Sequence, residues 1–105
     1  MDSLMPDLHP RRREFRALWD IHRNADWPEG VGSCAGELMT LDTVVSGCVA
    51  FFLEEETLDP PRVAILGDCL NELDNLLCDV ESETKEYFER LKSIGLLLME
   101  LGTPR

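Results

Sequence analysis

The segment from Ser33 to Glu56 constrains the fold of this chain more than any other. Between Cys34 and Leu53 it carries only two charged side chains, Glu37 and Asp42. Its apolar residues recur every three or four positions, which is the spacing of a helix packed against other helices. These residues are Cys34, Leu38, Leu41, Val45, Cys48 and Phe52. Further apolar positions widen the stripe almost around the cylinder, so we expect this helix to be buried at the centre of the fold.

Three other segments show the same periodicity, and no segment shows the period-two alternation of a half-buried strand. The clearest boundary is Asp59-Pro60, because aspartate caps helices and proline fits the first helical position. The connections are short, so consecutive helices should be antiparallel neighbours. We therefore predict an all-α, up-down bundle of four helices, with residues 1–105 as a single domain and 1–6 as a loose N-terminal tail. The expected helices span residues 8–24, 33–55, 60–78 and 82–101.

The formal net charge of −11 is unevenly distributed. Residues 31–84 hold twelve acidic side chains and one basic side chain, Arg62. Phosphate repulsion makes this surface unsuited to nucleic acid or anionic lipid, whereas a basic protein surface would be attracted to it. The same charge also serves solubility. We expect a protein partner with a basic patch to bind the outer side of helix 60–78 and the end of helix 33–55. The candidate residues are Asp68, Glu72 and Asp79, with Glu54, Glu55 and Glu56.

The end of helix 33–55 also suggests self-association, because three large apolar residues follow one another there. These residues are Phe51, Phe52 and Leu53. Contiguous exposed apolar patches are uncommon on monomers, and two-fold pairing is the commonest way to cover one, so a homodimer is expected. The alternative is a monomer in which helix 8–24 and Trp27 complete the cover. A strip of small residues that includes Gly36 and Gly47 indicates that another helix approaches this one closely.

Motifs for catalysis and for cofactor or metal binding are missing. The chain has no Glu-x-x-His pair, no glycine-rich phosphate loop and no G-x-S-x-G sequence. Its four cysteines, Cys34, Cys48, Cys69 and Cys78, lack metal-ligand spacing and stand beside apolar residues, where cysteine acts as a small hydrophobe.

No signal-peptide pattern is visible at the N-terminus, so we expect a reducing cytoplasm. The charges within helix 33–55 argue against a membrane span.

These observations favour a small acidic protein that acts by protein–protein interaction, as an adaptor, inhibitor or immunity-type module, without catalysis, cofactor or metal. The alternative is a small-ligand-binding bundle or minor enzyme that uses a pocket near Trp19, His22 and Trp27. A solvent-connected pocket of several hundred Å³ with converging polar groups would support that alternative. On the surface of helix 82–101, Glu86 and Arg90 stand four residues apart and can form an exposed ion pair, as can Glu81 with Lys85 and Lys85 with Glu89.

Overall fold

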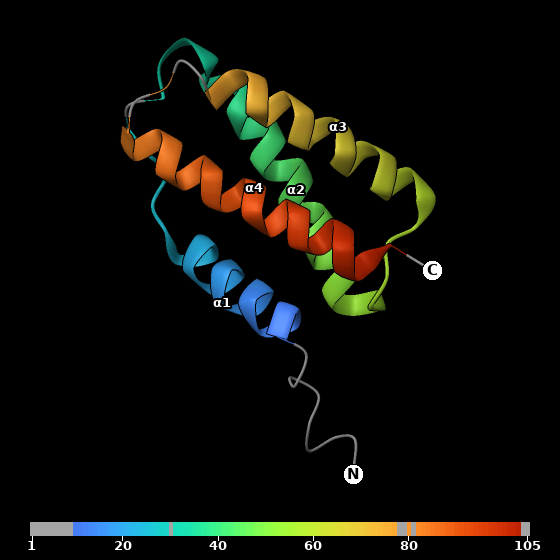
Figure 1. Cartoon of the computed structure of the whole chain (residues 1–105). Coiled ribbons are helices and arrows are strands. Elements are labelled where there is room, and N and C mark those ends of the chain that lie inside the picture. The colour runs from blue at the N-terminus through green and yellow to red at the C-terminus, as the bar shows by residue number, and fades with distance from the viewer. Residues whose placement is uncertain (1–9, 30, 78–79, 81, 104–105) are drawn as a thin grey trace.

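The computed structural model describes residues 10–29, 31–77, 80 and 82–103, and these residues contain four long helices and no strand (Figure 1). The helices run alternately in opposite directions along the molecule, so the predicted all-α bundle of four helices is confirmed. The predicted tail, residues 1–6, lies outside the described part of the chain. The elements are α1 Pro10–Asn24, a single 3₁₀ turn η2 Gly32–Cys34, α2 Ala35–Glu55, α3 Pro60–Leu76 and α4 Ser82–Gly102.

Both α2 and α4 contact all three other helices, since α2 packs on α3 and α4 and reaches α1 through Phe52 against Phe15. In the view of Figure 1, α4 lies between α1 and α3. The sequence predicts a central place for the second helix, and in the structure α2 and α4 share that place. One face of α2 stays open to solvent, where the side chains of Met39 and Leu53 are 53% and 39% exposed. The opposite face of α2 is buried in the core, as is the inner face of α4.

Close contacts at two glycines of α4 explain how this helix reaches its neighbours. A Cβ atom at Gly95 would lie 2.6 Å from Leu70 Cδ2 of α3, closer than real Cβ atoms come. A Cβ atom at Gly102 would lie 2.8 Å from Leu58 Cγ. The Leu58 N–H also donates to the Gly102 carbonyl at 2.9 Å, which ties the α2–α3 connection to the end of α4. The Asp59 cap is confirmed, because its side chain accepts the Arg62 N–H at 3.0 Å.

The small-residue strip on α2 is not covered by another helix of the same chain. Nothing lies within 4 Å of where a Cβ atom of Gly36 or Gly47 would stand. The nearby Thr40 and Thr43 are exposed and donate to carbonyls of their own helix, at 3.0 and 2.9 Å. Within one chain, the prediction that another helix packs closely on this strip is therefore wrong.

By length and hydropathy alone, α2 would suffice to cross a membrane, and it is the one such helix in the described ranges. Core helices of soluble proteins meet the same criterion. Two observations favour the core assignment for α2: Leu38 and Val45 are fully buried against the rest of the bundle, and Asp42 lies in the middle of the helix.

Candidate functional site

An open pocket of about 590 Å³ lies where the loop after α1 meets the first turns of α4. The α4 side chains fall three or four residues apart and therefore share one face of the helix. The two aromatic residues of the pocket, Trp27 and Tyr87, are half-buried and buried, whereas its four acidic residues are exposed. The aromatic rings therefore form the floor and the carboxylates form the rim. The lining residues are Ala25, Asp26, Trp27, Pro28, Glu29, Glu83, Glu86, Tyr87 and Arg90.

The rim of the pocket carries an excess of negative charge, with four carboxylates and one guanidinium, that of Arg90. Within the described part of the chain, no ion pair or hydrogen bond engages the side chains of these acids. They are Asp26, Glu29, Glu83 and Glu86. A concave surface lined by one sign of charge concentrates counter-ions of the opposite sign. The pocket is therefore suited to a cation.

The expected ion pair between Glu86 and Arg90 is not formed, because no nitrogen and oxygen of the two lie within 4 Å of each other. Arg90 instead holds its guanidinium over the ring of Tyr87, with Cζ 5.5 Å from the ring centroid. An exposed ion pair at this spacing contributes only about 0.2–0.5 kcal/mol, and a cation over an aromatic face at an exposed site contributes about 0.5–1 kcal/mol. The Nε atom of Arg90 is buried and has no acceptor among the described residues.

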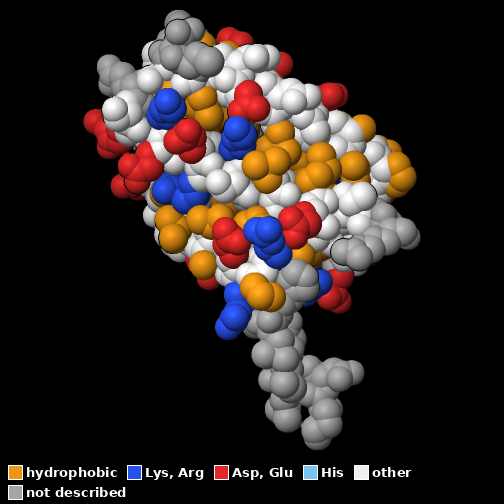
Figure 2. Space-filling view, in the orientation of Figure 1, with side chains coloured by type: hydrophobic (Ala, Val, Ile, Leu, Met, Phe, Trp, Pro, Cys, Tyr) orange, Lys and Arg blue, Asp and Glu red, His pale blue; other side chains and the backbone are white. Residues whose placement is uncertain are grey.

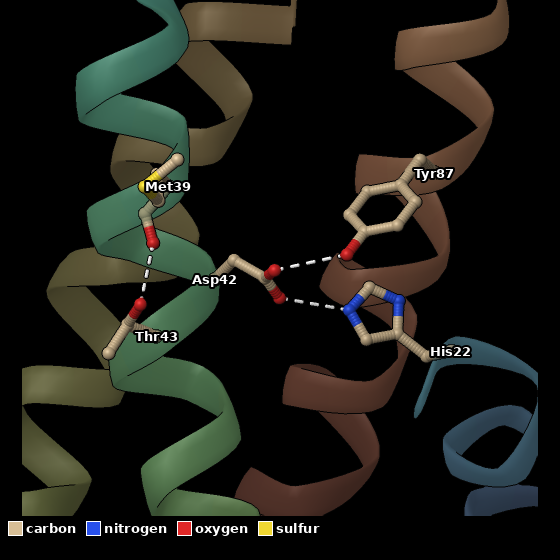
Figure 3. Close-up of polar contacts among 5 residues, drawn as sticks. All are labelled: His22, Met39, Asp42, Thr43 and Tyr87. Atoms are coloured by element: carbon tan, nitrogen blue, oxygen red, sulfur yellow. Dashed lines mark hydrogen bonds and ion pairs between the residues drawn. The ribbon is translucent and has the colours of Figure 1, made fainter. Parts of the chain in front are cut away.

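Tyr87, which lines the pocket, belongs to a hydrogen-bonded group of three residues that joins three helices (Figure 3). Asp42 of α2 lies 2.9 Å from His22 Nε2 of α1 and accepts the hydroxyl of Tyr87 of α4 at 3.0 Å. His22 and Tyr87 are 4% and 8% exposed. Burial, followed by the charge and the hydrogen bond of Asp42, raises the pKa of Tyr87 well above its ordinary value. These contacts hold the Tyr87 ring, and with it the floor of the pocket, in one orientation.

The expected pocket near Trp19, His22 and Trp27 is found in part. Trp27 lines it and packs edge-on against Tyr87 and Phe88, with ring centroids 5.7 and 5.5 Å apart. Trp19 stacks on His22 at 6.2 Å, and neither of these two residues lines the pocket. His22 is thus a packed, hydrogen-bonded core residue, as expected for a lone histidine on the inner face of a helix.

Sequence reasoning missed both Asp42 and Tyr87 as members of this region. A usable signal was present, because Asp42 is an acidic residue in the middle of an apolar helix. Buried or half-buried carboxylates need hydrogen-bond donors, so such a residue predicts polar partners on a facing helix. Which helix supplies them is not readable from local sequence.

The predicted partner-binding acids of the described residues lie on α3 and at the end of α2. On the face shown in Figure 2, acidic side chains are interspersed with basic and apolar ones. Asp68 and Glu72 are exposed on α3, about two and three turns from its start, and Glu72 lies roughly 18 Å along the axis from that end. Of the acids at the end of α2, Glu56 lies 3.5 Å from Arg12 of α1. The other two predicted residues there, Glu54 and Glu55, are exposed, and Asp79 lies outside the described residues.

The three apolar residues predicted for self-association do not form a continuous exposed patch. Phe52 is 3% exposed and packs edge-on against Phe15, with ring centroids 5.7 Å apart. Phe51 is half-buried and lies 3.8 Å beneath the guanidinium of Arg62, measured from Cζ to the ring centroid. Leu53 alone is exposed. Consecutive residues of a helix point about 100° apart, so neighbours in sequence rarely share one face.

The cysteines of the described region offer no activated nucleophile. Cys48 and Cys69 are buried free thiols, and burial raises the pKa of both. Cys34 is a half-buried free thiol, and Cys78 lies outside the described residues. Across residues 10–29, 31–77, 80 and 82–103, no three His, Cys, Asp or Glu side chains are grouped so that they could hold a metal ion.

No protein-family model, curated protein or solved structure matches this sequence. Its function has to be inferred from the pocket itself.

Proposed function

We propose that this protein is a non-catalytic binding module, acting in a reducing cytoplasm, that recognises a basic segment of a protein partner. The observation that carries the proposal is the pocket itself, in which four carboxylates without ion-pair partners surround the rings of Trp27 and Tyr87. Aromatic faces and carboxylates together are the groups with which proteins bind organic cations.

The overall charge of −11 supports this proposal at longer range. A strongly acidic protein attracts a basic partner before contact and thereby raises the association rate. In this proposal the exposed acids of α3, Asp68 and Glu72, steer the partner, and the pocket at the start of α4 makes the specific contact. The proposal thus keeps the partner expected from the sequence but shifts the centre of recognition away from α3.

A second candidate function is the binding of a small organic cation, such as a polyamine. The volume of about 590 Å³ favours it, since small-molecule sites typically enclose about 300–1,000 Å³. The rim of this pocket is open and charged, which suits a side chain presented by a larger surface better than an enclosed ligand.

The test is fluorescence anisotropy with a labelled peptide of alternating basic residues and glycines. One variant carries Asp26→Asn, Glu83→Gln and Glu86→Gln at the pocket. A matched control carries Glu54→Gln, Asp68→Asn and Glu72→Gln, and loses the same charge elsewhere. The pocket variant should bind about tenfold more weakly than the wild type, and the control less than about threefold, because contact interactions exceed steering in their effect on affinity.

Equal losses in the two variants would show that only net charge attracts the peptide, and absence of binding to the wild type would refute the proposal. Spermidine added as competitor separates the two candidates. If spermidine displaces the peptide at concentrations well below those at which charge screening alone would do so, the small-cation function is favoured.

A further inference from the structure

We infer that the pocket binds the guanidinium of an arginine from the partner, and that Arg90 occupies part of this site in the free protein and is displaced on binding. This inference rests on the proposed function and specifies its ligand.

The position of Arg90 shows which chemical group the floor of the pocket accommodates. Although Glu86 stands one turn away on the same helix, the guanidinium lies over the Tyr87 ring, with Cζ 5.5 Å from its centroid. Tyr87 is held from below by Asp42, so its ring presents a fixed face to the pocket. A planar cation from the chain itself therefore already lies against the ring that a ligand would contact.

The same contact holds Arg90 only weakly. The separation of 5.5 Å is near the outer limit of about 6 Å for a cation–π interaction. Its Nε atom is buried without an acceptor in the part of the chain that the structure describes. A buried donor without a partner is unfavourable, and this N–H would be hydrated if the side chain moved outward. The free state of the pocket thus favours exchange of Arg90 for a better-bonded cation.

A second depression gives Arg90 a place to go. It has a volume of about 450 Å³, lies on the exposed face of α4 and shares Arg90 and Glu86 with the pocket. Its other lining residues include Lys85 and Glu89. An Arg90 side chain that swings into this depression can pair with Glu86 or Glu89, and the face of Tyr87 becomes free.

The arrangement favours arginine over lysine as the incoming residue. A guanidinium is planar, stacks on aromatic faces and is weakly hydrated, whereas an ammonium is compact and strongly hydrated. With its face on Tyr87, a guanidinium directs its N–H groups outward in the plane, toward the other carboxylates of the rim, such as Asp26 and Glu83. Charge-assisted pairs of this kind are commonly bidentate for arginine and not for lysine.

The test compares two labelled peptides of equal length and charge, one containing arginine and the other lysine. They are titrated against the wild type, Arg90→Gln and the control Lys85→Gln. The control removes the same charge from the neighbouring turn of α4, where Lys85 lines the second depression and not the pocket. Measurements at about 0.3 M salt screen the exposed charges, and circular dichroism checks that all three proteins have the same helix content.

The arginine peptide should bind the wild type about fivefold tighter than the lysine peptide. The Arg90→Gln variant should bind the arginine peptide about fivefold tighter than the wild type, and Lys85→Gln should change this affinity less than twofold. Weaker binding by Arg90→Gln would overturn the inference by showing that Arg90 donates to the ligand. Equal affinities for the two peptides, or equal gains in the two variants, would overturn it as well. In those cases the peptides still bind and the proposed function stands, whereas binding of neither peptide refutes both.

Discussion

Replacing Asp42 with alanine should destabilise the bundle by about 2–4 kcal/mol. The carboxylate is the partner of two buried groups, His22 Nε2 and the Tyr87 hydroxyl. A buried donor that loses its acceptor costs about 1–3 kcal/mol, and here two are affected. The Asp42 side chain is 19% exposed, so water can reach part of the site, and the lower half of the summed range applies. For a domain of this size the change corresponds to a fall in Tm of roughly 10–25 °C.

Equilibrium unfolding in urea, followed by tryptophan fluorescence, measures this loss. The matched control is Thr43→Ala, at the next position, whose exposed hydroxyl bonds only to the Met39 carbonyl of its own helix; it should cost less than about 1 kcal/mol. A double-mutant cycle with Tyr87→Phe adds a second check, because that substitution should cost less once Asp42 is gone. If Asp42→Ala costs no more than Thr43→Ala, the three-residue network does not stabilise the fold and the reasoning is wrong.

Three further predictions concern other parts of the molecule. Tyr87 is the only tyrosine, so ultraviolet absorbance reports its ionisation directly; because its pKa is raised on folding, stability should fall as the pH rises above about 10, and Tyr87→Phe should reduce this dependence, with the buried thiols of Cys48 and Cys69 accounting for the rest. Gly95→Ala should cost about 1–3 kcal/mol in urea unfolding, since the added methyl overlaps Leu70, and an unchanged midpoint would contradict the close packing of α3 on α4. We also propose a homodimer through the open, uncharged face of α2 around Met39 and Gly47: light scattering behind a sizing column should give twice 11.9 kDa, Gly47→Glu should restore the monomer, and a monomeric wild type at high concentration would rule the dimer out.

Half of the pocket can be predicted from the sequence alone. Glu83, Glu86, Tyr87 and Arg90 follow helical spacing, so their common face is a property of one continuous segment. The other half comes from the loop at residues 25–29, more than 50 positions earlier in the chain. No local pattern specifies which helix end lies against that loop, because either end of any neighbouring helix could cover Trp27.

The four helices, the cap at Asp59 and the sign of the surface charge follow from the amino-acid sequence alone. These features depend on neighbouring residues, through periodicity, capping geometry and composition, and the structure bears out the helices and the cap. Which helix faces meet, and the position of Asp42 opposite His22 and Tyr87, depend on the tertiary packing. Several helix faces here are similarly apolar, so the choice among their pairings depends on side-chain shape and on which buried polar groups find partners.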